Sequence, residues 1–263
     1  MCESVYSALE QRLQETGTPG MSLTVLEEGR IAWSAAYGVA DASLRVPLTS
    51  DHVLYACSMS KFLTAMTAMA MTDRYKIDLD ADVNSYLRTW TLPGCEQPRS
   101  QAVSLRSLLC HQAEIFDAED GFGDLMFGSA VPDLPDILAG RTSLNPKPTY
   151  AERPPYEQFA YSDAGYCVVE QALADVSSKS FQELTMELVL EPLGLEHSFV
   201  EQPITLDHAL VAASGHDPDG RVIDGRFPDY VSRRLRKKIT VPASMRTVAP
   251  TVARRFTVFL CFE

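Results

Sequence analysis

Two segments far apart in the chain carry residue types that could together form and break an ester. Ser58-Met59-Ser60-Lys61 is an S-x-x-K pattern, and positions i and i+3 of a helix share a face. The spacing therefore predicts that the Lys61 amine lies beside the Ser58 hydroxyl. A serine alcohol is a weak nucleophile until a neighbouring base takes its proton. Burial pushes a lysine toward its neutral form, which makes Lys61 a candidate for that base.

The same four residues also have a simpler interpretation, in which a serine caps a helix and a lysine lies on the helix surface. An S-x-x-K pattern arises by chance in a chain of this length at roughly even odds. The segment that follows argues against this interpretation. Residues 62–73 contain no Gly or Pro, are rich in Ala and Met, and are apolar nearly all round. A lysine at the head of a buried helix is costly unless it has a role.

Tyr161-Ser162-Asp163 is the second feature. A cation next to a phenol favours loss of the phenol proton, so Tyr161 beside Lys61 could relay protons to a leaving group. Asp163 could hold Lys61 or a substrate amide. The simpler alternative is a loop tyrosine before a helix, with Ser162 or Asp163 as its N-cap. Taken alone, this segment favours the simpler alternative.

Several elements are expected to position these residues. An apolar face predicts a helix over residues 3–15, and two strand-like runs around a turn at 27–30 predict an antiparallel hairpin. The Ala- and Met-rich run predicts a helix over 58–73, buried in the middle of the protein. Further helices are expected over 103–110, 166–176 and 181–190, with long loops and short helices over 117–158. A hairpin followed by helices indicates an α+β or α/β class with a helical lobe after the first strands.

Composition excludes several classes of protein and site. The 263 residues carry a net charge of −12, which argues against a nucleic-acid binder. No run of apolar residues is long enough for a membrane span. The first residues, Met1 to Ser4, lack the features of a signal peptide, so the cytoplasm is the default location, although relatives are often exported. The six cysteines and five histidines are scattered, without the spacing of a metal site, and no metal or organic cofactor is expected.

Together the two motifs resemble the serine β-lactamase and penicillin-binding-protein-like superfamily. The similarity is to the branch with class C β-lactamases, D-alanyl-D-alanine carboxypeptidases and related esterases. Ser58 to Lys61 matches the S-x-x-K of these enzymes, and Tyr161 to Asp163 stands where the branch carries Y-x-N. Other similar stretches are residues 29–41, 76–87, 103–111, 159–162 and 191–195. The resemblance covers about residues 5–228.

The resemblance implies the β-lactamase/transpeptidase-like α/β (α+β) fold, an antiparallel sheet flanked by helices with a helical lobe. It implies a serine hydrolase that forms an acyl-enzyme on Ser58, with Lys61 and Tyr161 as catalytic residues and Asp163 in substrate binding. The implied partner is a small-molecule substrate, namely a β-lactam, a D-amino-acid peptide or an ester. Which of Lys61 and Tyr161 acts as the base stays open, as does the oligomeric state.

The chain departs from the family pattern at three places. Asp163 replaces the usual Asn and cannot donate a side-chain hydrogen bond while ionised. His111-Gln112-Ala113-Glu114 stands where the family reads H-T-S-G, which is expected to alter a structural turn. After residue 200 no Lys or His is followed two residues later by Gly, so the family's third motif, K-T-G or H-x-G, is missing. The alternative function is therefore a non-catalytic or inactive truncated member that acts only as a binding or degenerate protein.

Residues 231–263 differ sharply in charge from the rest of the chain. They hold eight Lys or Arg and one acid, whereas residues 1–230 hold 15 basic and 34 acidic residues. We therefore divide the chain into an incomplete hydrolase domain over 1–230 and a basic tail over 231–263. The tail either binds an acidic partner or is translated out of frame, and we favour the second reading because the shift coincides with the end of the resemblance. A sheet without its last strands exposes apolar surface, which predicts low stability or aggregation.

Overall fold

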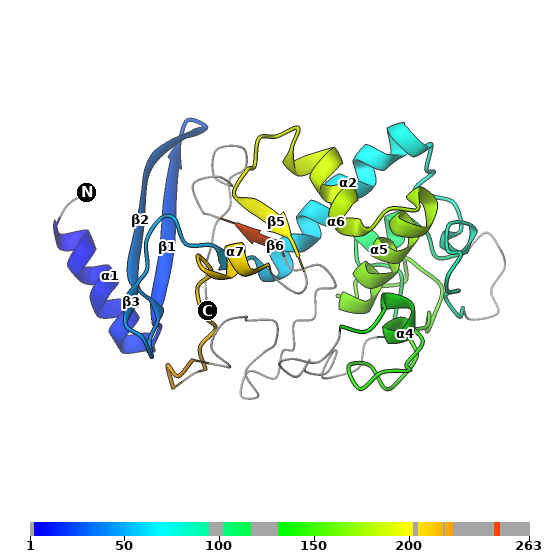
Figure 1. Cartoon of the computed structure of the whole chain (residues 1–263). Coiled ribbons are helices and arrows are strands. Elements are labelled where there is room, and N and C mark those ends of the chain that lie inside the picture. Colours follow the sequence, from blue (N-terminus) through cyan, green and yellow to red (C-terminus); the bar gives the residue numbers. More distant parts are fainter. Residues whose placement is uncertain are drawn as a thin grey trace. The chain divides into compact units, whose positions relative to one another are not determined.

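A computed structural model describes residues 3–94, 102–116, 131–201, 205–217, 219–222 and 245–247 (Figure 1). The chain forms two compact units. The first contains residues up to Ala56, the segment from Leu193 to Arg236, and the last residues from Met245. The second runs from Cys57 to Pro192, with the short segment Lys237–Ser244. All residues of the two predicted motifs therefore belong to the second unit.

The first unit opens with a helix and a long hairpin, as the sequence predicts. Helix α1 (Glu3–Thr16) precedes strands β1 (Gly20–Glu27), β2 (Arg30–Asp41) and β3 (Val46–Pro47), which form an antiparallel sheet in the order β1-β2-β3. The hairpin turn has positive φ at both Glu28 (49°) and Gly29 (74°). Two such residues in a row are typical of the turn whose twist matches the strands on either side.

A second antiparallel sheet completes the described part of the first unit. Its order is β4-β6-β5, formed by β4 (Leu54–Tyr55), β6 (Met245–Thr247) and β5 (Ser198–Val200). Next to it lies the short helix α7 (Leu206–Ala209). Buried Val53 and Phe199 form a small core, onto which Ala209 and Ala212 pack.

A buried aspartate ties β2 to a distant loop of the same unit. The Asp41 carboxylate accepts hydrogen bonds from the hydroxyls of Ser43 (2.6 Å) and Ser214 (2.7 Å) and from the backbone N–H of Leu44 (2.8 Å). Burial alone would raise the pKa of Asp41, but these donors outweigh burial and lower it to about 2.

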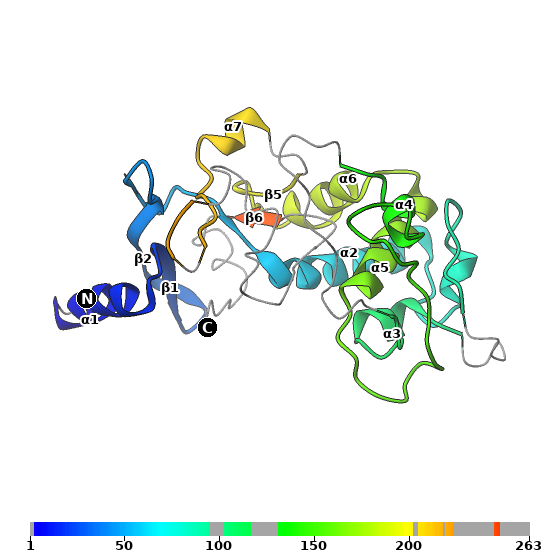
Figure 2. The ribbon, with the colours of Figure 1, turned by 90° about the horizontal axis from the view of Figure 1, so that it is seen from below.

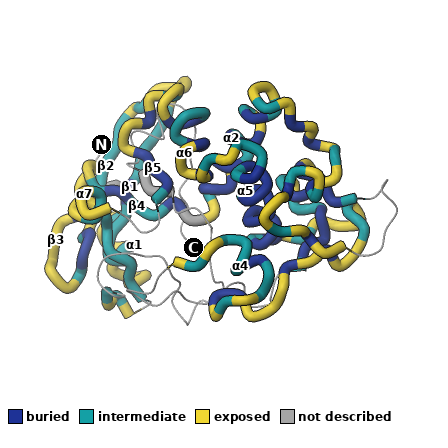
Figure 3. Tube along the Cα trace, turned by 45° about the vertical axis from the view of Figure 1, so that its right-hand side comes forward, coloured by how far each residue is buried: buried dark blue, intermediate teal, exposed yellow. Residues whose placement is uncertain are grey.

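The second unit is helical, and α5 is its centre (Figure 2). Helix α5 packs against α2, α3, α4 and α6, and its buried residues appear dark blue in Figure 3. The elements of the unit are η1 (Cys57–Met59), α2 (Ser60–Tyr75), η2 (Val83–Ser85), α3 (Leu105–Leu109), α4 (Leu134–Leu138), α5 (Asp163–Ser177), α6 (Phe181–Thr185) and η4 (Met186–Leu190). The helices expected over 103–110, 166–176 and 181–190 are present, the last with its second half widened into a π-helix.

Helix α2 is confirmed, but its burial differs from the prediction. The expectation of a helix buried on all sides is wrong, because Phe62 and Met69 are 57% and 53% exposed. Only one face of α2, which includes Leu63, Thr67 and Met71, is fully buried, and the helix packs on α5, α6 and η4. An Ala- and Met-rich composition shows that a helix tolerates burial, and does not show how many sides have a neighbour.

The predicted fold class is confirmed, since antiparallel strands and a helical lobe form the described structure. The predicted loops over 117–158 contain α4, and residues 117–130 lie outside the described residues. Apart from 245–247, the basic tail over 231–263 also lies outside them.

Candidate active site

The side chains of the two predicted motifs meet on one oxygen atom in the second unit. Ser58 lies in η1, the 3₁₀ turn that leads into α2. The Lys61 Nζ lies 3.5 Å from Ser58 Oγ, and Tyr161 Oη donates a hydrogen bond to the same Oγ at 2.8 Å. Lys61 is 6% exposed and Tyr161 is 50% exposed. A hydroxyl with a buried amine on one side and an accessible phenol on the other is the arrangement that the sequence predicts.

Asp163 pairs directly with Lys61, in both a hydrogen bond and a salt bridge, and both side chains are largely buried. Burial lowers the pKa of Lys61, but the charge of Asp163 and hydrogen bonds with Asp163 and Tyr161 outweigh it, so the pKa of Lys61 is raised. The pairing with Asp163 thus opposes the effect of burial that makes Lys61 a candidate for the base. A buried lysine with a carboxylate partner keeps its proton.

The start of α5 explains why Tyr161 and Asp163 point to one place. The Ser162 hydroxyl caps the helix by accepting the N–H of Gly165 at 2.8 Å, which fixes where the chain turns from loop into helix. Asp163 falls in the first turn, where the helix dipole favours a carboxylate. Since α5 packs on α2, this carboxylate meets the lysine at the start of α2.

The segment after α3 holds the loop that carries Tyr161. The backbone N–H of Tyr156 donates to the Gln112 carbonyl at 2.7 Å, and that of Glu152 donates to the Glu114 carbonyl at 2.8 Å. The buried Glu114 carboxylate accepts from both the backbone and the side-chain amide of Gln158, at 3.1 and 3.2 Å. Glu114 has a positive φ of 50°, and it stands where the resemblance has glycine. The unusual residue of this turn, Glu114, therefore holds the loop that carries Tyr161 through its hydrogen bonds with Gln158.

His111 contacts the Tyr161 loop in three ways. Its carbonyl accepts the N–H of Ala160 (2.8 Å), its Nδ1 accepts the N–H of Ser162 (3.1 Å), and its ring stacks on the Tyr161 ring with centroids 4.4 Å apart. Sequence reasoning missed His111 and Glu114 as parts of the site. The departure from H-T-S-G marked the segment but gave no indication of what it touches.

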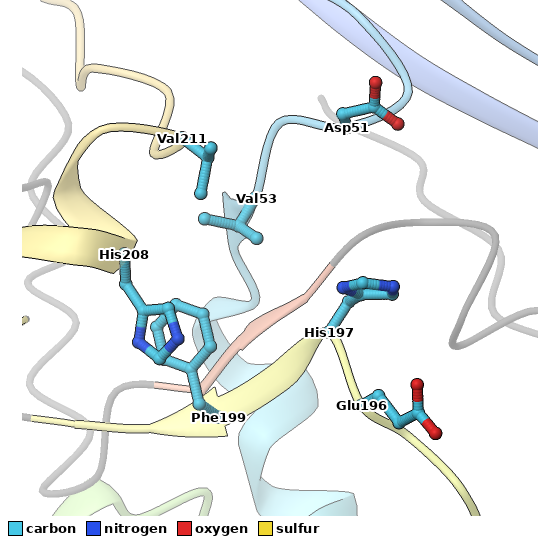
Figure 4. Close-up of a pocket in the computed structure, with 7 residues that line it drawn as sticks. All are labelled: Asp51, Val53, Glu196, His197, Phe199, His208 and Val211. Atoms are coloured by element: carbon cyan, nitrogen blue, oxygen red, sulfur yellow. The ribbon is translucent and has the colours of Figure 1, made fainter.

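A separate pocket lies within the first unit (Figure 4). It has a volume of about 320 Å³, and His208 stacks on Phe199 in its wall with ring centroids 3.7 Å apart. None of the predicted site residues lines it; its lining residues are Asp51, Val53, Glu196, His197, Phe199, His208 and Val211.

The described residues provide neither a cluster of metal ligands nor a membrane-spanning helix. Across the described residues, no group of three His, Cys, Asp or Glu side chains could hold a metal ion. Among the helices in those same parts of the chain, none combines the length and the apolar character needed to cross a bilayer.

Comparison with known proteins places this geometry in context. Teichoic acid D-alanine hydrolase of Staphylococcus aureus is 23% identical over 200 residues, which are 75% of this chain and 45% of that protein. The chain thus spans about half the length of the curated relatives it matches.

Two solved structures share the fold. The octameric penicillin-binding protein homologue from Pyrococcus abyssi superposes with a TM-score of 0.69 at 21% identity, over 95% of this chain and 54% of that chain. D-amino acid amidase from Ochrobactrum anthropi SV3 superposes with a TM-score of 0.72 at 19% identity, over 96% of this chain and 67% of that chain.

The family model described as Beta-lactamase matches residues 6–255, nearly the whole chain and part of its basic segment. The fold of the chain and the S-x-x-K motif at Ser58 to Lys61 agree with this match. The chain therefore belongs to the beta-lactamase family.

Proposed function

We propose that the protein is a serine hydrolase that works through an acyl-enzyme on Ser58. The observation that carries the proposal is the convergence of Tyr161 Oη (2.8 Å) and Lys61 Nζ (3.5 Å) on Ser58 Oγ. An activated nucleophile needs a base within hydrogen-bond reach, and Tyr161 Oη lies at that distance. Tyr161 can accept the Ser58 proton once it has lost the proton that it donates in this hydrogen bond.

In the proposed reaction Ser58 Oγ attacks a substrate carbonyl and loses its proton to Tyr161. Lys61 stays an ammonium because Asp163 holds it, so it does not compete as a base. The backbone N–H of Ser58 donates to the oxyanion. Tyr161 then gives its proton to the leaving group, which departs, and Ser58 is left as an ester. Water then attacks the ester carbonyl while Tyr161 accepts its proton. Tyr161 returns that proton to Ser58 Oγ as the bond between Oγ and the acyl carbon breaks, which releases the carboxylic acid and restores both residues.

The proposed substrates are small carboxylic esters or amides, including those of D-amino acids, and β-lactams. The relatives support this range, because their names describe a teichoic acid D-alanine hydrolase and a D-amino acid amidase, and another similar structure is a class C beta lactamase. All three activities cleave a bond at an acyl carbon, which is the reaction that a serine ester serves.

The test is covalent labelling followed by intact-mass spectrometry. A fluorophosphonate should add one equivalent to the wild-type chain, and a β-lactam or a D-alanyl ester should form a transient adduct. Ser58→Ala should abolish both labelling and turnover, whereas Ser43→Ala, a serine of the first unit, should leave them unchanged. An unlabelled wild-type chain that still binds such ligands would support the alternative, a binding member of the family without catalysis.

A further inference from the structure

His111 accepts hydrogen bonds from the residues on both sides of Tyr161. Its carbonyl accepts the N–H of Ala160, directly before Tyr161, and its Nδ1 accepts the N–H of Ser162, directly after it. The two bonds fix the peptide unit before Ala160 and the one between Tyr161 and Ser162. The stacked rings, inclined by 29°, restrict the direction of the phenol. One residue therefore determines both the backbone and the side-chain position of Tyr161.

The backbone of His111 is held in a conformation that needs support. Its φ is +58°, in the left-handed region that is unfavourable for a residue with a side chain. It follows directly after Cys110, the C-cap of α3, at the position where a helix often ends with a glycine. A glycine there would provide the turn and the carbonyl acceptor but neither the ring nor Nδ1. The side chain thus adds two contacts that the turn itself does not require.

The hydrogen bond from Ser162 defines the state of the imidazole. Because Nδ1 accepts a backbone N–H, the ring proton lies on Nε2 and the ring is neutral. The charged and titratable groups that face the ring are Lys61, Asp163, Tyr161 and Tyr166. Burial lowers the pKa of His111, and the Lys61 charge lowers it further against a smaller opposing effect of Asp163.

From this geometry we propose that His111 is the positioning residue of the reaction, whose neutral imidazole holds Tyr161 Oη on Ser58. The inference rests on the proposed function, since it concerns how Tyr161 is held for that reaction. Protonation of Nδ1 would remove the acceptor for the Ser162 N–H and put a second cation beside Lys61. Acid would therefore release Tyr161 at the pH where His111 becomes charged, below its ordinary value of 6.5.

Three substitutions separate the contacts of His111. In His111→Asn the amide oxygen replaces Nδ1 as the acceptor, without a group that titrates, and Asn tolerates a positive φ. In His111→Phe the stacked ring stays and the acceptor is lost. In His111→Ala both are lost. The rate constant of fluorophosphonate labelling on Ser58 and the hydrolysis of p-nitrophenyl acetate are measured from pH 4 to 9.

We expect His111→Asn to keep the labelling rate near neutral pH within a few-fold and to shift the acidic limb of its pH profile to lower pH. His111→Phe and His111→Ala should lose about tenfold or more at all pH values, since small misplacements of a catalytic group are costly. The matched control is His216→Asn, a half-buried histidine of the first unit whose Nε2 accepts the Ala42 N–H at 3.0 Å. This variant should change the stability of the protein but leave the acidic limb of the labelling rate at the wild-type pH.

The positioning role would be overturned if the acidic limb of the labelling rate in His111→Asn lay at the wild-type pH, or if His111→Phe and His111→Ala were labelled as fast as the wild type. Either result would leave the proposed hydrolase function intact. A wild-type chain that is neither labelled nor active would instead overturn the function, and the positioning role with it. Nitrogen-15 NMR of histidine-labelled protein provides a readout without substrate or variants. It should show Nδ1 of His111 unprotonated at neutral pH, and a protonated Nδ1 there would contradict the proposal.

Discussion

At the scale of single residues, Asp163 is the departure with the clearest chemical consequence. The branch that the chain resembles carries Asn at this position, and the carboxylate found here binds the Lys61 ammonium. The pKa of Lys61 is raised by this pairing, which bears on the choice between the two candidates for the base. A lysine that keeps its proton supports a tyrosine base electrostatically, whereas a lysine that loses its proton could be the base itself.

Asp163→Asn should lower the pKa of Lys61, because it removes the partner charge and leaves burial to act. If Lys61 serves as a cation, the alkaline limb of the labelling rate should move to lower pH and the rate at pH 8 should fall about tenfold. A faster rate at neutral pH would assign the base role to Lys61. The control is Asp80→Asn, which breaks an exposed ion pair with Arg106 in the same unit and should change neither.

The limits of prediction from sequence are also visible at this scale. Ser58 and Lys61 could be identified from residue type and helical spacing. Tyr161 and Asp163 could be identified only through the resemblance, because they stand where the family carries Y-x-N. His111 could not, because its role depends on backbone N–H groups about fifty residues later in the chain, and any sequence there has such groups.

At the scale of elements, α5 carries two carboxyl groups of different kinds. Asp163 in its first turn belongs to the candidate site, and Glu170 further along the helix does not. Glu170 is half-buried, two turns after Asp163 on the same side of the helix, and burial raises its pKa to about 8. The positions of α2, α3 and α5 could be predicted from the sequence, that of α2 from an Ala- and Met-rich composition without Gly or Pro. The exact start of α2 could not be predicted, because no side chain caps the helix at that end. Ser58 therefore lies in a 3₁₀ turn before the helix and not in its first turn.

Glu170→Gln should stabilise the second unit above about pH 5. A carboxyl with a raised folded-state pKa costs stability once the unfolded chain ionises at 4.5, and the cost grows until the folded group ionises at about 8. The melting temperature of the variant should exceed that of the wild type by several degrees at pH 8 and match it at pH 4. An equal difference at both pH values would show that ionisation of Glu170 is not the cause.

At the scale of the whole molecule, the two units should respond differently to acid. Asp41 belongs to the first unit and has a pKa of about 2. Its depressed pKa contributes stability that is present above the unfolded value of 3.8 and is lost as the pH falls to 2, about 2 kcal/mol in all. Asp41→Asn should remove this dependence from the transition of the first unit, as followed by denaturation between pH 2 and 6. Unchanged acid sensitivity would show that other carboxyl groups dominate.

The predicted low stability of the chain also belongs to this scale and stays a prediction. Phe62 and Met69, seven residues apart on α2, add exposed apolar surface to it. The class of fold followed from the order of hairpin and helices, whereas the division into two units did not. That division depends on contacts between segments as distant as Asp41 and Ser214, which no local pattern encodes.

The place where the chain passes from one unit to the other has a mechanical consequence. One boundary falls between Ala56 and Cys57, so Ser58, the proposed nucleophile, is only the second residue of its unit. A force applied to the first unit is transmitted to Ser58 through two peptide bonds. Tyr161 and Asp163, by contrast, lie well inside the second unit and are braced by their neighbours. Tension along this stretch of the chain would therefore reach Ser58 before it reached Lys61 in α2.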